Sequence, residues 1–79
     1  MDSNQYDIID KFSKDNSVKV QITHSTTNPW YIIKVTPLRG LWAEVEWNVS
    51  YGAVYYELER ILSGMYKELT LRLCDEVSG

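Results

Sequence analysis

The sequence predicts an α+β domain: a two-layer sandwich of α-β-β-β-α(α) order, in which a three-stranded antiparallel meander carries its helices on one face. Three observations lead to this fold class. Apolar residues recur at helical spacing near both ends of the chain, they alternate with polar residues in the middle, and the connecting segments are short. Because 79 residues leave room for one hydrophobic core, residues 1–79 are expected to form a single domain.

The first helix is expected over residues 3–14. Ser3 or Asn4 can cap its N-terminus, and Tyr6, Ile9 and Phe12 follow at helical spacing. Residues 15–17 are turn formers and should end the helix. Apolar and polar side chains then alternate over residues 18–23, which predicts the first strand, and residues 25–29 read as a loop.

Two further strands are expected to complete the meander. Residues 30–36 are rich in β-branched and aromatic side chains, and Pro37 should stop this strand because it has no N–H to donate. Residues 37–40 form an expected tight connection, and residues 41–49 alternate most regularly of all. The apolar set of this third strand, expected to face the helices, is Leu41, Ala43, Val45, Trp47 and Val49.

Side-chain alternation also predicts the register and the uncovered face of the sheet. If the odd residues of 31–35 point inward with the apolar set of the third strand, Lys34 can pair with Glu44 and Tyr31 with Trp47. The opposite face then has no helix over it. Its expected side chains are Lys19, Gln21, Thr23, Trp30, Ile32, Lys34, Trp42, Glu44, Glu46 and Asn48.

From about residue 51 the spacing of apolar residues becomes helical, with a stripe that includes Val54, Leu58 and Leu62. Gly64 is expected to interrupt this helix. Residues 66–74 fit either a strand or a helix. We favour helix, because Glu68 and Arg72 stand at the i,i+4 spacing that stabilises helices.

Charge and composition narrow the classes of function. The net charge is −3, and residues 44–79 hold seven acids against three Lys/Arg, so direct binding to nucleic acid is disfavoured. The first residues do not resemble a secretory signal, and the apolar runs are too short for a membrane span. With a single cysteine, Cys74, the chain is expected in a reducing compartment, the cytoplasm.

No catalytic, metal or cofactor site is predicted. His24 is the only histidine, and no nucleophile pairs with it at a recognisable spacing. Cys74 and His24 lack the spacing of a zinc site, and the scattered glycines form no phosphate-binding loop. The chain is therefore expected to act by binding and not by catalysis.

Two surfaces are candidates for binding. On the open sheet face, Trp30, Ile32 and Trp42 predict an interface, with cover by the chain's own segments and formation of a homodimer as the alternatives. Glu44 and Glu46, followed by Glu57 and Glu59 beside aromatic residues, could imitate a row of phosphates, or could simply be a solvated surface. The predicted partner-binding residues are Trp30, Ile32, Trp42, Glu44, Glu46, Tyr55, Tyr56, Glu57 and Glu59.

Two resemblances follow from this order of elements. The α-β-β-β-α order resembles that of double-stranded-RNA-binding domains, but residues 51–57 are aromatic and acidic where those domains carry basic residues. Size, acidity and element order resemble those of small phage-encoded inhibitors of the anti-CRISPR type. The second resemblance implies a phage-encoded protein in the host cytoplasm, with a protein partner such as a host nuclease or another nucleic-acid-binding protein. The alternatives are a homodimeric module and a weak nucleic-acid-binding module that uses Lys19 and Lys34.

Overall fold

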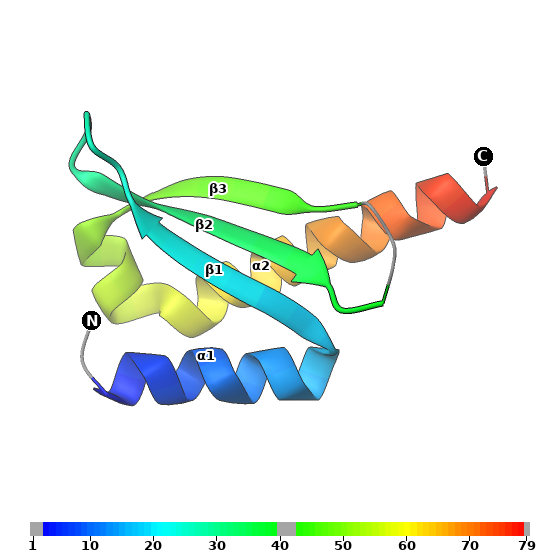
Figure 1. Cartoon of the computed structure of the whole chain (residues 1–79), viewed down its shortest axis with the longest axis horizontal. Helices are drawn as coiled ribbons and strands as arrows, with labels where there is room; N and C mark the ends of the chain where they lie inside the picture. The colour runs from blue at the N-terminus through cyan, green and yellow to red at the C-terminus, as the bar shows by residue number, and fades with distance from the viewer. Residues whose placement is uncertain (1–2, 40–42, 79) are drawn as a thin grey trace.

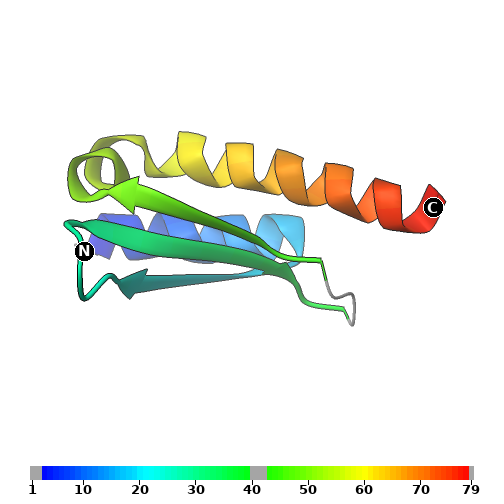
Figure 2. The ribbon, with the colours of Figure 1, turned by 90° about the horizontal axis from the view of Figure 1, so that it is seen from above.

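The computed structural model describes residues 3–39 and 43–78 and confirms the predicted α+β class. Helix α1 is Ser3–Asn16 and helix α2 is Tyr51–Ser78, one at each end of the chain. Between them lie the strands β1 (Val18–His24), β2 (Trp30–Pro37) and β3 (Val45–Ser50). Figures 1 and 2 show both helices on one side of the sheet.

The sheet is an antiparallel meander of order β1-β2-β3, and its side chains alternate as predicted. Ile33, Val35 and Val45 are fully buried on the face toward the helices. Val18 is also buried there, and the remaining apolar side chains of β1 pack against the same core. Because only one face of the sheet is buried, burial determines which side chains of each strand point inward. A one-residue slip of a strand would turn all of its apolar side chains toward solvent.

The predicted pairing of β2 with β3 was wrong by two residues. Lys34 lies opposite Glu46, not Glu44, and Tyr31 lies opposite Val49. Strand β3 begins at Val45 and not at residue 41, so the connection from β2 is longer than a tight turn. A shift of the β2–β3 register by two residues leaves every side chain on the same face of the sheet, so alternation alone could not distinguish the two registers. Leu41 and Trp42, predicted within this strand, lie outside the described residues.

Helix α1 uses a slightly different face from the predicted one. Tyr6 is exposed, whereas Gln5 is buried and donates a hydrogen bond from Nε2 to the carbonyl oxygen of Val54, 3.3 Å away. Ile8, Ile9 and Phe12 pack against the core on the same side as Gln5. The helix ends at Asn16, and the positive φ of Ser17 (53°) turns the chain into β1.

Helix α2 continues through residues 66–74, which confirms helix for this segment. The predicted interruption at Gly64 was wrong: the non-helical backbone lies at Glu57, with φ −127° and ψ 22°. Gly64 instead allows close packing, because a Cβ there would lie 3.0 Å from Cη2 of Trp47. Among the described side chains of α2, the buried ones are Val54, Leu58, Leu62, Met65 and Leu69.

A polar network joins β3 to the second half of α2. The indole Nε1 of Trp47 donates to Oε2 of Glu68 at 2.7 Å, and Oε1 of Glu68 accepts from Arg72 at 3.0 Å. Arg72 also donates to the carbonyl oxygen of Glu44. The Glu68–Arg72 pair predicted from spacing is thus present, and it is part of a contact between the layers.

Candidate binding surfaces

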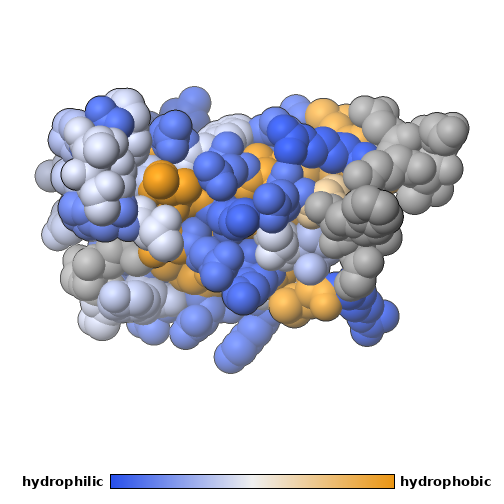
Figure 3. Space-filling model, turned by 45° about the horizontal axis from the view of Figure 1, so that its top comes forward, coloured by the Kyte–Doolittle hydropathy of each residue, from blue (hydrophilic) through white to orange (hydrophobic). Residues whose placement is uncertain are grey.

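The open face of the sheet carries the first group of predicted site residues. Trp30 and Ile32 are half-buried on β2, while Glu44 and Glu46 are exposed. Trp42, the third apolar residue predicted for this surface, lies outside the described residues. Figure 3 looks onto this face and shows mainly hydrophilic side chains with apolar atoms between them.

Charges on the open face are balanced. Lys34 stands between Gln21 and Glu46 in the ladder, and its Nζ lies 3.4 Å from Oε2 of Glu44. Ile32 is flanked by Thr23 and Asn48. A lysine already paired with a carboxylate is a weak contributor to phosphate binding, and an isoleucine between two polar residues is a small apolar patch.

The remaining predicted residues lie on the helical layer. Tyr55 and Tyr56 are 58% and 83% exposed, and their ring centroids are 5.1 Å apart in an edge-to-face arrangement. Glu57 and Glu59 follow in α2 and are exposed as well. The kink at Glu57 separates the turns that carry the tyrosines from the rest of the helix.

The predicted acidic edge from Glu44 to Glu59 is therefore not one continuous surface. Glu44 and Glu46 lie on the open sheet face, whereas Glu59 borders a hollow between the two helices. The change of element accounts for this: alternation on a strand and a 3.6-residue period on a helix place equal sequence spacings on different faces.

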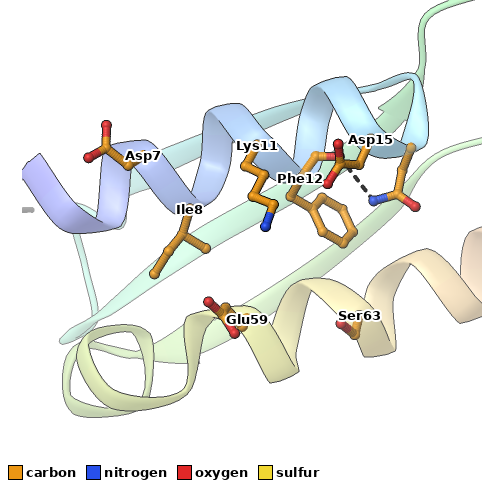
Figure 4. A pocket seen from close by; sticks show the side chains of 8 residues that line it. Asp7, Ile8, Lys11, Phe12, Asp15, Glu59 and Ser63 are labelled. Atoms are coloured by element: carbon orange, nitrogen blue, oxygen red, sulfur yellow. Dashed lines mark hydrogen bonds between the residues drawn. The ribbon is translucent and has the colours of Figure 1, made fainter.

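The hollow between α1 and α2, which we call the helix groove, brings together residues from both ends of the chain. Its first part, about 320 Å³, is lined by Asp7, Ile8, Lys11, Phe12, Asp15, Asn16, Glu59 and Ser63. Its second part, about 680 Å³, continues past Ile8 and Glu59 to Asn4 and to the exposed Tyr55 and Tyr56. Figure 4 shows Ile8, Lys11 and Phe12 directed from α1 toward α2.

Packing explains why the helix groove stays open. On the α2 side it is bordered by Ser63 and Glu59, a small side chain and a charged one that does not fill an apolar gap. Phe12 reaches across and meets Tyr66 edge-to-face, with centroids 6.0 Å apart. This aromatic contact holds the helices together at one end of the groove, and Gln5 contacts Val54 at the other.

The rim of the helix groove is acidic. Four carboxylates line its two parts, those of Asp7, Asp15, Glu57 and Glu59, against two basic residues, Lys11 and Arg60. Within the described part of the chain, the ion pairs are Lys34–Glu44, Arg60–Glu57 and Arg72–Glu68, so Glu57 is paired with Arg60, while Asp7, Asp15 and Glu59 take part in none. Their charges remain available to a partner.

Sequence reasoning missed Asp7, Lys11, Asp15 and Ser63. A signal existed: Asp7, Lys11 and Asp15 stand at i, i+4 and i+8, which places them on one helical face beside the apolar stripe. The position of α2 opposite that face could not be read from the spacing. It depends on how both helices cross the sheet.

A second cluster surrounds His24, at the end of β1. Tyr51 Oη lies 3.1 Å from Nδ1 of His24, and the rings of Tyr31 and Tyr51 pack against each other and against the imidazole. Nδ1 is also 3.3 Å from the carbonyl oxygen of Ser25. The cluster joins the β1–β2 hairpin to the start of α2, and its contacts are those of a packing site.

Among the side chains that the structure describes, no group of three or more from His, Cys, Asp or Glu is arranged to hold a metal ion. No described helix is both long and apolar enough to cross a membrane. Comparison with protein-family models, with curated proteins and with solved structures finds no match for this chain. Functional inference therefore rests on the surfaces described above.

Proposed function

We propose that this protein is a non-enzymatic inhibitor or adaptor that binds the basic surface of another protein. The observation that carries the proposal is the helix groove, where unpaired carboxylates meet exposed tyrosines. Carboxylates form strong hydrogen bonds with Arg and Lys, and tyrosine faces attract the same cations. The open sheet face is charge-balanced, so it supports this role less well.

The proposed partner is a nucleic-acid-handling protein, such as a nuclease of the host. Such proteins hold phosphates with Arg and Lys, and an acidic surface can occupy the same groups. A small acidic chain encoded by a phage or mobile element, acting in the manner of anti-CRISPR inhibitors, fits this role. Absence of catalysis is part of the proposal, and the packing of His24 against two tyrosines supports it.

Affinity capture from a bacterial lysate with the immobilised chain, followed by nucleic-acid competition, tests the proposal. We expect a captured protein that binds nucleic acid alone and releases it when this chain is added. Charge reversal in the groove, Glu59→Lys, should weaken capture. The matched reversal on the open face, Glu46→Lys, should leave it unchanged. Simultaneous binding of chain and nucleic acid to the captured protein would contradict the proposal.

A homodimeric interaction module is the second candidate. The partial exposure of Trp30 and Ile32 on a face that no described helix covers favours it. Sedimentation equilibrium distinguishes the two functions. A dimer that Ile32→Lys dissociates would support the second candidate, and a monomer at high concentration would remove it.

A further inference from the structure

We propose that the helix groove binds an α-helix of the partner, a basic amphipathic helix that lies between α1 and α2. This inference rests on the proposed function and names the element recognised. The groove runs along α1 from Asn4 to Asn16, a rise of about 18 Å at about 1.5 Å per residue. It is therefore long enough for about three turns of a helix.

The walls of the groove favour a helix over an extended segment. Both walls are helices, and outside the terminal turns of α1 and the kink at Glu57 their backbone N–H and C=O groups are engaged within the helices themselves. An extended peptide between them would lose hydrogen bonds to water and find no backbone partners in return. A helix brings its own hydrogen bonds and needs only side-chain contacts.

The floor of the groove supplies those apolar contacts. Ile8 and Phe12 are half-buried on α1 and directed toward α2, and they stand one turn apart. A guest helix with apolar side chains at i, i+3 or i+4, and i+7 can place them over this pair. The exposed rings of Tyr55 and Tyr56 extend the contact surface at one end.

The rim specifies the charge of the guest. Asp7 and Asp15 are two turns apart on α1, about 12 Å along the axis, with Lys11 between them. An Arg or Lys residue of the guest can reach Asp15, while a polar or acidic residue one turn away faces Lys11; Asp7 points away from α2 (Figure 4) and adds negative charge at the outer edge of the rim. Glu59, on the opposite wall, accepts a further basic residue.

A second copy of this chain does not fit the same requirement. The residues of α1 include three aspartates and two lysines, and those of α2 include five acids and three Lys/Arg, so each helix carries a net negative charge. Either helix of a second copy would add carboxylates to the acidic rim. A basic helix of a different protein is the occupant that complements the groove.

Selection from a display library of random peptides about 16 residues long, about 24 Å as a helix, tests the inference. The immobilised full chain is the target, and enriched peptides are synthesised and measured by fluorescence anisotropy and circular dichroism. We expect enriched peptides with helical apolar spacing and at least two Arg or Lys residues, and we expect their helicity to rise on binding.

Matched variants locate the binding site. Asp15→Lys should weaken binding of the selected peptides by about tenfold or more, and Glu46→Lys on the open sheet face should leave it unchanged. Thermal unfolding of each variant establishes that it is folded. Failure to enrich any peptide, enrichment of acidic or non-helical peptides, or equal binding by Asp15→Lys would each overturn the inference.

The inference and the proposed function can fail separately. If a nucleic-acid-binding partner is captured through Glu59 but binds through an extended segment, the function stands and the helix proposal falls. If basic helices bind the groove but no captured partner loses its nucleic acid, the helix proposal stands and the inhibitory function falls. Peptide selection and nucleic-acid competition are thus independent readouts.

Discussion

Substitution of Gly64 by alanine tests the packing of β3 on α2, because two effects of known size oppose each other there. Alanine inside a helix is favoured over glycine by about 1 kcal/mol. The new Cβ, however, would lie 3.0 Å from Cη2 and 3.4 Å from Cζ3 of Trp47. Overpacking of this kind costs about 1–3 kcal/mol when the neighbour cannot move.

The ring of Trp47 is tied to α2, since its Nε1 donates a 2.7 Å hydrogen bond to Glu68. We therefore expect overpacking to exceed the gain in helix propensity, and Gly64→Ala to lower the free energy of unfolding by about 1 kcal/mol. Urea denaturation followed by circular dichroism gives this value.

Two controls separate the opposing effects. Gly52→Ala adds a Cβ with no heavy atom within 4 Å, so it should stabilise the protein by about 0.4–1 kcal/mol. In a Trp47→Phe background the smaller ring removes the close contact, and Gly64→Ala should then become stabilising. Stabilisation by Gly64→Ala in the wild-type background would refute the reasoning, because the indole would have to shift freely despite its hydrogen bond.

Three other substitutions have expected effects of different size, all measurable by urea denaturation. Leu62→Ala removes a fully buried side chain and should cost about 2–5 kcal/mol; a loss below about 1 kcal/mol would mean that the core collapses around the cavity. Glu68→Ala leaves the part-buried indole N–H of Trp47 without its acceptor and should cost about 1–3 kcal/mol, whereas an unchanged midpoint would show that water replaces the carboxylate. Arg60→Ala removes an exposed ion pair with Glu57, in which the two charged atoms are 3.7 Å apart, and should change the free energy of unfolding by less than about 0.5 kcal/mol. A larger change would mean that the pair helps to maintain the kink at Glu57.

Periodicity predicted the parts of the fold that burial decides. The odd residues of β2 and β3 face the helices because only that choice buries Ile33, Val35 and Val45 together. The stripe on α2 was predicted for the same reason, and Leu58 and Leu62 are buried within it. In each case a single local period of apolar residues determines the side that is removed from water.

The pairing register of β2 with β3 and the role of Gly64 in α2 were less predictable, because more than one arrangement fits the same spacing of apolar residues. Pairing Lys34 with Glu44 or with Glu46 leaves every residue on its own face, and the observed 3.4 Å ion pair to Glu44 shows that the diagonal neighbour also suffices. Gly64 was predicted as a break from propensity alone. The ring of Trp47, distant in sequence, gives that glycine its packing role.

Some residues of the helix groove were predicted from the sequence, namely its tyrosines and the carboxylates of α2. The location of the groove between the two helices was not predicted. Tyr55, Tyr56, Glu57 and Glu59 lie together on α2, as their closeness in sequence requires. Their combination with Asp7 and Asp15 depends on the distance between two helices that the sequence separates by a whole sheet. A groove between elements is a property of their packing, so a pattern within either helix cannot reveal it.

Core and groove share two residues, and this decides which variants can report on binding. Ile8 and Phe12 line the groove and also pack against the core, and Phe12 contacts Tyr66. Phe12→Ala should therefore lower both peptide affinity and the free energy of unfolding, the latter by about 3–5 kcal/mol if the ring is as constrained as a core aromatic.

Asp15 has no such double role, since it is exposed and forms no ion pair within the described residues. Asp15→Lys should change affinity while stability stays within about 0.5 kcal/mol. Peptide titration and urea denaturation on the same two variants check this division. If Asp15→Lys unfolded the protein, the rim carboxylates would be part of the structure that holds α1 against α2, and their charge would not be available to a partner.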